Sequence, residues 1–407
     1  MNNYKKVGIL NVYDARNRGD RAIVEAQLGL IRKMIPNVEV VIFTPHHDFN
    51  CRIFESSSCV EPLISAPLGA SALWRLISPP IDWLLHILRR RSDHRAKAFH
   101  SCDAYFFCGG GYLYSSPAPL FSRQLWLHVA NMLAALQSGK PVLAFPQSWG
   151  PIRKSADRWI CRKLASALPT IVTRGCESDL MLSAWGYGEK IVSLPDVVIA
   201  ASELIPETAD WRLSSRHKGS LGIAPIDWNF DRKVNASGLS EYISKLVSIS
   251  QAWCLTAGNS VTVFPQVEVE GADDDGIIAR KLVEALFAVG VPVSFAEGLG
   301  WGDYWTNIAA QEVFIGCRMH SCIFAMVCGV PTIGLGYQPK FAELFEQLGQ
   351  LDRNHLIEDF DPATVSTQLN KISNEEERIA ITRMVDSTGC KVVAALEKVW
   401  HKTIAGS

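Results

Sequence analysis

The chain has 407 residues, 48% of them hydrophobic and 20% charged, with a formal net charge of −1 at pH 7. This ordinary globular composition predicts two or three domains of roughly 150 residues each, and the charge balance gives no argument for a nucleic-acid partner. The eleven cysteines form neither a CxxC pair nor a zinc-finger pattern, so we expect reduced thiols in a cytoplasmic protein. There is neither a signal-peptide pattern at the N-terminus nor an apolar run of the ~18 residues that a membrane span needs.

The first half of the chain alternates apolar strands with amphipathic helices, which is the pattern of an α/β fold. Loops that are polar or glycine-rich follow three of the strands, at the place where ligands contact such sheets: residues 14–20, 109–111 and 147–151. The predicted strands are residues 6–13, 38–44, 103–108, 141–146, 170–173 and 191–194, and the predicted helices are 21–34, 120–138 and 156–168, with another from 177.

Small and polar residues in these loops are candidate ligand contacts. Asn17, Gly19 and Asp20 stand in the first loop. Alternatively, Gly19 only makes the turn and Asp20 only caps the next helix. The glycines of residues 109–111 would let a ligand approach the backbone closely, or simply permit a tight turn. Neither a dinucleotide-binding fingerprint nor a P-loop is present.

Residues 68–100 combine an apolar, tryptophan-bearing stretch with the basic run Arg89–Arg91. Such a segment would suit an anionic membrane surface and would place the protein peripherally on the inner face of the cytoplasmic membrane. The alternative is a core-packing helix with a solvated basic end, because amphipathic helices usually face a core.

A second β/α series follows a polar stretch, residues 202–218, that indicates a linker. Its predicted strands are residues 220–224, 260–264, 292–295, 313–315 and 332–335, and its helices are 240–257, 273–289 and 304–311. We therefore predict an N-terminal β/α domain (1–205), a C-terminal β/α domain (206–375) and a helical tail (376–407) that could cross back. The two Rossmann-like domains would have parallel sheets and face each other across a cleft.

The stretch from Val313 to Lys340 has the sequence of a strand, a helix and a second strand. Arg318 and His320 stand at the start of the helix, where free N–H groups and the helix dipole favour an anion. Lys340 follows the next strand on the same edge of the sheet, and Arg174 follows a strand of the first domain. These cations predict a ligand with phosphate or carboxylate groups. The alternatives are a core histidine and a surface ion pair for Arg174.

Other catalytic chemistries have weak sequence support. His320 is the best candidate for a general acid or base, because its pKa can serve near neutrality. The run Asp273–Asp275 is interpreted as a solvated loop and helix start rather than a metal site. A serine nucleophile would need a GxSxG elbow, which the chain lacks.

With these motifs in order, the chain resembles the polysaccharide pyruvyltransferase family. Each motif is weak alone, but together they cover roughly residues 5–350. The family usually has Arg-Leu-His where this chain has Met319, and its first loop is usually richer in glycine. The matching pieces are Asn17–Asp20, Gly109–Gly111, Pro146–Pro151, Thr173–Arg174 with Ser178, Pro195–Asp196, Gly316–Ser321, Gly329–Pro331 and Tyr337 with Lys340.

The resemblance implies a GT-B-like fold and transfer of the enolpyruvyl unit of phosphoenolpyruvate to two hydroxyls of one sugar. The product is a cyclic pyruvate ketal on a bacterial surface polysaccharide or its precursor, and phosphate is released. The implied reaction requires no metal or organic cofactor, and phosphoenolpyruvate takes part in it as a co-substrate. His320 and Arg318 would be catalytic, and Arg174, Arg318, Lys340 and Ser321 would bind phosphoenolpyruvate. The acceptor, free or lipid-linked, would contact Asn17, Gly19, Asp20, Gly109, Gly110, Gly111 and Gln147.

Two other functions stay open from the sequence. A GT-B glycosyltransferase that uses a nucleotide sugar would share the two domains and the basic phosphate site. A non-catalytic sugar-phosphate-binding protein would keep the basic pocket but tolerate loss of His320. Four tryptophans near predicted loops are either sugar platforms or packing residues: Trp149, Trp228, Trp301 and Trp305.

Overall fold

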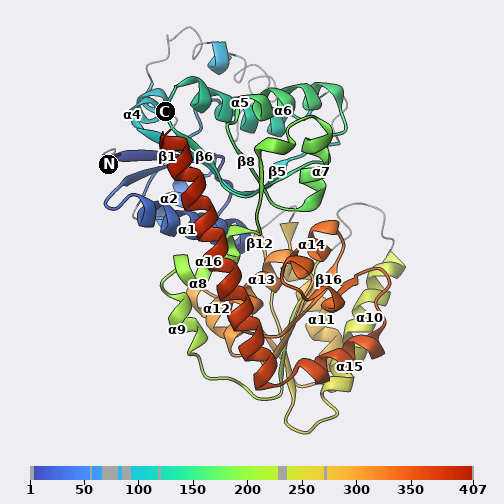
Figure 1. The fold of residues 1–407 in the computed structure, drawn as a ribbon. Helices are drawn as coiled ribbons and strands as arrows, with labels where there is room; N and C mark the ends of the chain where they lie inside the picture. Colours follow the sequence, from blue (N-terminus) through green and yellow to red (C-terminus); the bar gives the residue numbers. More distant parts are fainter. Residues whose placement is uncertain are drawn as a thin grey trace. The chain divides into compact units, whose positions relative to one another are not determined.

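The computed structural model describes residues 4–55, 57–66, 81–84, 93–117, 121–227, 236–269 and 273–405. The chain forms two compact units, each with parallel sheets and covering helices, so the predicted α/β class is confirmed (Figure 1). The first unit is Met1–Ala15, Asp20–Val197 and Val392–Ser407, and the second unit is Arg16–Gly19 and Val198–Lys391.

The first unit contains a five-stranded sheet in the order β3-β2-β1-β4-β6, in which all neighbours are parallel. Its central strands are almost entirely apolar and buried, as expected when helices cover both faces. Because the strand order reverses between β1 and β4, the loops after these two strands flank the topological switch point, where α/β sheets bind ligands.

A second parallel sheet of this unit has the order β5-β7-β8-β9. The chain leaves β4 and β6 of the first sheet and enters β5 and β7 of the second within a few residues. The prediction of loops at Gly109–Gly111 and after Pro146 is therefore wrong in part. Gly110 and Gly111 begin β5, and Gln147 begins β7. The sequence did not indicate these strands, because short polar strands lack the apolar run that marks a buried strand.

Aromatic side chains of β4 alternate between the two faces of the first sheet. Tyr105 stacks on Phe99 with the ring centroids 4.7 Å apart. Phe106 points to the other face, where Trp400 of α16 lies 5.1 Å away. The end of the last long helix thus completes the core of the first unit.

The described helices and strands of the first unit lie between residues 6 and 193, apart from the C-terminal part of α16. They are β1 (Lys6–Leu10), α1 (Arg18–Met34), β2 (Glu39–Phe43), α2 (His47–Ile53), β3 (Ser58–Val60), α4 (His94–Ser101), β4 (Ala104–Phe107), β5 (Gly110–Leu113), α5 (Arg123–Gln137), β6 (Val142–Ala144), β7 (Gln147–Trp149), α6 (Ser155–Ala167), β8 (Ile171–Thr173), α7 (Cys176–Ala184) and β9 (Ile191–Ser193).

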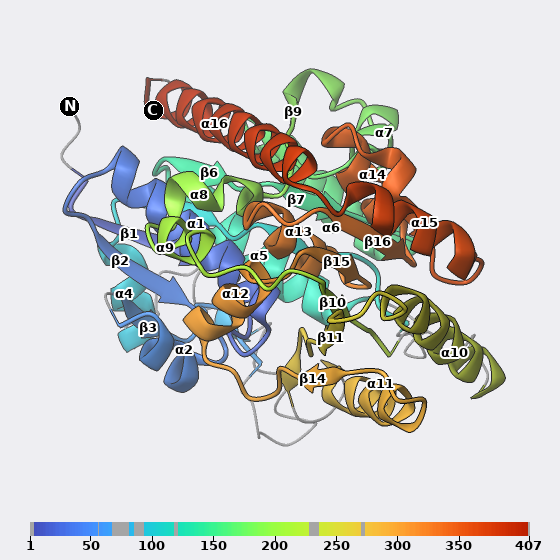
Figure 2. The same cartoon turned by 90° about the horizontal axis from the view of Figure 1, so that it is seen from below.

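The second unit is built on a six-stranded parallel sheet in the order β14-β11-β10-β15-β16-β17. Figure 2 shows α10 and α11 on one side of it and α12 and α13 on the other. Apolar residues of α10, α11 and α15 form the core on the first side. On the other side Phe264 and Phe314 pack near Tyr304 and Phe324. The strand order reverses between β10 and β15, which sets the switch point of this unit.

The elements of the second unit are α8 (Ala201–Leu204), α9 (Thr208–Arg212), β10 (Ser220–Ala224), α10 (Ala236–Trp253), β11 (Ser260–Val263), β12 (Glu268–Val269), β13 (Asp273–Asp274), α11 (Gly276–Ala288), β14 (Val293–Phe295), α12 (Trp301–Ala309), β15 (Val313–Gly316), α13 (Met319–Val327), β16 (Thr332–Gly336), α14 (Pro339–Gln347), β17 (Asn354–Leu356), α15 (Pro362–Ile372) and α16 (Glu375–Ala405), which continues into the first unit.

The predicted linker contains helices, and the predicted membrane-surface segment is described only in part. The stretch taken as a polar linker contains α8 and α9, and its Trp211 is buried and stacked on Trp305 with centroids 4.8 Å apart. The basic run Arg89–Arg91 and most of the predicted membrane-surface segment lie outside the described residues. Among the helices that the structure describes, none has the length and apolar character needed to span a membrane.

Candidate functional site

The predicted anion site begins where β15 ends and α13 starts. The strand is apolar and buried, and Arg318, with an extended backbone (φ −116°, ψ 141°), stands directly before the helix. A Cβ on Gly316 would lie 2.4 Å from Cys322 Sγ, so this tight strand-to-helix turn requires glycine. The free N–H groups of the first helical turn therefore open at the carboxyl edge of the sheet.

This helix start lies at the switch point of the second unit. β10 and β15 are neighbours, with Ala224 paired to Gly316, and their following helices α10 and α13 cover opposite faces. The crevice outside the carboxyl ends of two such strands is the usual ligand site of an open α/β sheet. Arg318 and His320 thus occupy the position that the topology itself selects for binding.

Arg318 is held by a buried carboxylate. Its Nε and Nη2 donate to the two oxygens of Asp275 at 2.6 and 2.8 Å. Asp275 is 0% exposed, and one of its oxygens also accepts the N–H of Val267 at 3.1 Å. The interpretation of Asp273–Asp275 as merely solvated is therefore wrong for Asp275. This pair fixes the plane of a guanidinium that has five N–H donors in all, of which Asp275 takes two.

His320 lies against Gly19, in the first turn of α1. A Cβ on Gly19 would come within 2.4 Å of the imidazole Nδ1. Gly19, predicted to contact the acceptor, is thus packed on His320, and its N–H donates to Asn17 Oδ1 at 2.9 Å. Ser321 is fully buried, and its hydroxyl donates to the Arg318 carbonyl at 2.7 Å, so it secures the helix turn.

Lys340 lies in the first turn of α14 rather than in a loop. Because β16 pairs with β15, the starts of α13 and α14 are at the same edge of the sheet. The lysine is half-buried. The structure therefore places Arg318, His320 and Lys340 on one edge of the second unit, as the sequence predicts.

Arg174 belongs to the first unit, where it follows β8. It is 8% exposed, pairs through Nη1 with the buried carboxylate of Asp196, and donates from Nε to Ser148 Oγ at 3.2 Å. A Cβ on Gly111 would lie 3.4 Å from its Nη2. Within the first unit Arg174 is thus next to a predicted acceptor residue. Its convergence with the cations of the second unit stays a prediction.

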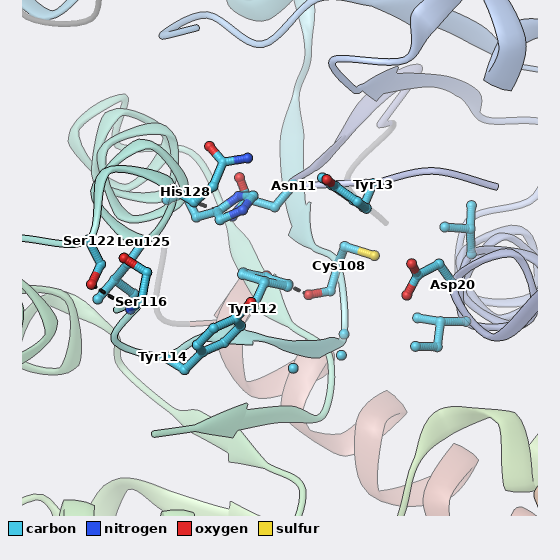
Figure 3. A pocket seen from close by; sticks show the side chains of 16 residues that line it. Asn11, Tyr13, Asp20, Cys108, Tyr112, Tyr114, Ser116, Ser122, Leu125 and His128 are labelled. Atoms are coloured by element: carbon cyan, nitrogen blue, oxygen red, sulfur yellow. Dashed lines mark hydrogen bonds between the residues drawn. The ribbon is translucent and has the colours of Figure 1, made fainter. Parts of the chain in front are cut away.

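A cavity of about 280 Å³ lies at the switch point of the first unit (Figure 3). The predicted acceptor residues Asp20, Gly109, Gly110 and Gly111 line it. Asp20 is in the first turn of α1, which begins at Arg18, so the predicted helix start at Arg21 and capping role of Asp20 are wrong. The cavity therefore collects four of the seven acceptor residues predicted from the sequence.

Backbone demands explain two of these glycines. Gly110 has φ +118°, a conformation that favours glycine, and a Cβ on Gly109 would lie 2.9 Å from the Pro146 carbonyl oxygen. Gln147 stabilises two residues that line the cavity: its Nε2 donates to the Cys108 carbonyl at 2.9 Å and to the Tyr112 hydroxyl at 2.5 Å. It holds the glycine-rich turn and does not line the cavity.

Sequence reasoning missed several residues that line this cavity. Asn11 has φ +64°, which is uncommon for a residue other than glycine, and it donates to the His128 carbonyl at 3.3 Å. Burial lowers the pKa of His128 to about 4, so the imidazole is neutral at pH 7. Tyr13 and Tyr114 are 48% and 50% exposed at the cavity. His128 stands apart from these loops in the sequence, and single tyrosines beside them carry no pattern that signals this placement.

The tryptophan platforms predicted from the sequence are largely packing residues. Trp149 and Trp305 are 2% and 0% exposed, and Trp301 packs edge-on against Trp211 and Trp305. Trp228 lies outside the described residues. Within the described part of the chain, no group of three or more His, Cys, Asp or Glu side chains is arranged to hold a metal ion.

Solved structures share the fold at low sequence identity. A Listeria monocytogenes protein assigned as a UDP-N-acetylglucosamine 2-epimerase is 14% identical, with a TM-score of 0.61 over 98% of this chain and 97% of that one. The Neisseria meningitidis UDP-GlcNAc 2-epimerase bound to UDP-GlcNAc is 13% identical, with a TM-score of 0.57 over 99% and 100%. A glycosyltransferase from Rickettsia africae is 10% identical, with a TM-score of 0.58 over 100% of both chains. At these identities the likeness establishes the GT-B-like fold alone.

No curated protein matches the chain significantly in sequence. A family model, described as polysaccharide pyruvyl transferase, matches residues 17–339. The matched range begins at the Asn17 loop, includes the glycines of the first-unit cavity and ends one residue before Lys340, so it covers most of both units. The chain therefore belongs to the polysaccharide pyruvyl transferase family.

Proposed function

We propose that the protein transfers the enolpyruvyl unit of phosphoenolpyruvate to two hydroxyls of one sugar in a surface polysaccharide or its precursor. Family membership supports pyruvyl transfer to a polysaccharide. The observation that carries the finer proposal is the start of α13, where Arg318, oriented by Asp275, stands beside His320 at the switch point of a parallel sheet. A small anion with two acidic groups suits that position.

The proposed roles follow from the chemistry of each group. Arg318, Lys340 and the N–H groups of α13 bind the phosphate and carboxylate of phosphoenolpyruvate, and the family resemblance gives Arg174 of the first unit a part in binding the same co-substrate. His320 is the general acid or base, because imidazole exchanges protons near neutral pH. Asp275 keeps the guanidinium in one plane, so little rotational freedom remains to be lost when the anion binds.

The reaction balances without a redox partner. A proton adds to the methylene carbon of phosphoenolpyruvate while the oxygen of a first sugar hydroxyl bonds to C2, and that hydroxyl gives up its proton. The bond between C2 and the phosphate oxygen then breaks. The oxygen of a second hydroxyl of the same sugar bonds to C2, its proton is released, and the cyclic ketal and phosphate are the products. His320 provides or accepts one of these protons.

The acceptor sugar is assigned to the cavity of the first unit. Its wall combines the backbone of Gly109–Gly111 with the carboxylate of Asp20 and the half-exposed rings of Tyr13 and Tyr114. Sugars are bound by such a mixture of polar groups and aromatic faces. A lipid-linked or soluble acceptor fits this proposal equally, and the reaction is assigned to the cytoplasm, where phosphoenolpyruvate is made.

The test incubates the full-length protein with phosphoenolpyruvate and a panel of lipid-linked and nucleotide-linked sugars, followed by mass spectrometry and a phosphate assay. We expect a ketal product that gains the mass of pyruvate minus water, with one phosphate released per ketal. His320→Ala should abolish it while the circular dichroism spectrum stays unchanged. Full activity of that variant would refute the role of His320.

The alternative is a glycosyltransferase that uses a nucleotide sugar, since one of the solved structures with the same fold is a glycosyltransferase. A thermal-shift comparison distinguishes the two, because a ligand that binds only the folded state raises the melting temperature. Stabilisation by phosphoenolpyruvate but not by UDP- or GDP-sugars supports the proposal. The reverse pattern, with sugar transfer in the mass-spectrometric assay, would favour the alternative.

A further inference from the structure

The segment Arg16–Gly19 belongs to the second unit, and Arg18, the first residue of α1, makes several contacts there. Arg18 is 8% exposed, and its Nη2 donates to Glu268 Oε2 at 2.5 Å and to the Leu299 carbonyl at 3.0 Å. Its Nη1 donates to the Pro265 carbonyl at 3.2 Å, and its guanidinium lies 4.3 Å above the centre of the Tyr304 ring. This planar, many-armed contact is one that arginine makes and lysine cannot reproduce.

Gly19 of this segment lies on His320. A Cβ on Gly19 would lie 2.4 Å from Nδ1, 2.8 Å from Cγ and 3.1 Å from Cε1, so the ring rests directly on the Gly19 backbone. Asn17 closes the turn through its Oδ1 and pairs with Val267 in an isolated β-bridge. Phe324 lies nearby, with its ring centroid 6.3 Å from that of the imidazole. Gly19, in the first turn of α1, thus confines one side of the imidazole.

We propose that the segment Arg16–Gly19 is a positioning element for the imidazole of His320. Arg18 anchors the segment, and Gly19 provides a flat backbone surface that leaves the ring in one orientation. The inference rests on the proposed function, in which His320 moves a proton. A proton-transferring group must be held in place by its neighbours, and a misplacement of about 1 Å can cost 10²-fold in rate.

This inference gives Gly19 a role that differs from acceptor binding. If Gly19 touched the acceptor, its replacement would mainly raise the KM for the sugar. If it positions His320, the replacement lowers kcat, alters the pH dependence of kcat, and leaves both KM values nearly unchanged. A merely structural glycine would lower the melting temperature without either kinetic effect.

The test compares Gly19→Ala with a matched control, Gly302→Ala. Gly302 lies in α12 of the same unit, and the nearest atom to a Cβ there is 3.8 Å away. We expect Gly19→Ala to lower kcat by about 10- to 100-fold, with KM changes under about threefold and a shifted pH optimum, whereas Gly302→Ala stays near wild type. Equal kcat values in the two variants would overturn the inference.

A second readout does not depend on activity. The imidazole proton resonance of His320 is identified by its absence in His320→Gln and followed through a pH titration. It should move and change its titration midpoint in Gly19→Ala but not in Gly302→Ala. An unchanged resonance in Gly19→Ala overturns the positioning role, even if no ketal product is ever found. Failure of the wild-type protein to make ketal, with a moved resonance, counts against the proposed function alone.

Arg18 gives the corresponding test of the anchor. Arg18→Met should lower kcat and move the His320 resonance in the same direction as Gly19→Ala, because the segment Arg16–Gly19 loses its anchoring contacts. Arg18→Lys should retain more of the wild-type kcat than Arg18→Met, since lysine can still pair with Glu268 but cannot also bind the carbonyl groups. A melting temperature lowered in Arg18→Met, with kcat and the resonance unchanged, would show a structural role and refute the anchor.

Discussion

Removing the carboxylate of Asp275 should lower both the stability of the second unit and its affinity for phosphoenolpyruvate. In Asp275→Asn the guanidinium of Arg318, whose side chain is 16% exposed, loses its counter-charge and one of its two acceptor oxygens. The amide can still accept the N–H of Val267, which the carboxylate accepts at 3.1 Å. The substitution therefore isolates the charge pair with little change of shape.

The size of the effect follows from the geometry. Two unit charges about 4 Å apart attract by ~4 kcal/mol at an effective dielectric constant of ~20, and breaking a buried ion pair by removing one partner costs roughly 3–5 kcal/mol. Because Arg318 keeps some contact with solvent, we expect the lower end, a loss of about 3 kcal/mol in the free energy of unfolding. The phosphoenolpyruvate KM should rise, because the guanidinium can now rotate.

The assay is a double-mutant cycle of Asp275→Asn and Arg318→Met, with urea unfolding followed by circular dichroism. Removing both partners should cost less than the sum of the single changes, with a coupling of about 2–3 kcal/mol. If the two losses add within ~0.5 kcal/mol, the pair does not stabilise the unit. A phosphoenolpyruvate KM that stays at the wild-type value in Asp275→Asn would refute the orienting role as well.

Three further predictions concern burial. Arg378 donates to two carbonyls at the end of α12 at 2.9 and 2.8 Å, so Arg378→Met should lower the free energy of unfolding by ~2–3 kcal/mol; an unchanged urea midpoint would contradict this. Burial lowers the pKa of His128 from 6.5 to about 4, so the unfolded state binds more protons than the folded state between these pH values. The free energy of unfolding should therefore fall by at most ~3 kcal/mol as the pH drops from 6.5 to 4. His128→Gln should flatten that decline, and a pH profile identical to that of the wild type would contradict the prediction. Iodoacetamide should modify the exposed thiols of Cys51, Cys176 and Cys390 in the native protein, and mass spectrometry should find the buried thiols modified only after denaturation.

Apolar periodicity was sufficient to predict most of the strands and long helices. The strand predicted at 313–315 and the helix predicted to follow it agree with β15 and α13, because a buried parallel strand and a helix followed by glycine both leave local marks. β3 and β17 were missed, since each has three residues and an edge position in its sheet. Such short edge strands carry little apolar pattern.

The candidate site was predictable where function lies in one local motif. Arg318, His320 and Lys340 fall within 23 residues, and their shared edge follows from the pairing of two strands. Asp275 was misjudged because its partner lies 43 residues away, and sequence charge does not show burial. The contact of Gly19 with His320 spans some 300 residues, so no local pattern could reveal it.

The long helix α16 has a consequence for biosynthesis. Trp400, 2% exposed, lies 5.1 Å from Phe106 and 5.6 Å from Tyr4, measured between ring centroids. Phe106 and Tyr4 precede the tryptophan by 294 and 396 residues in the sequence, so both leave the ribosome long before it does. Until translation reaches it, the nascent first unit displays an uncovered apolar patch of the kind that chaperones hold. A fragment stopping at Val197 should accordingly aggregate, and adding residues 392–405 as a separate peptide should improve its solubility.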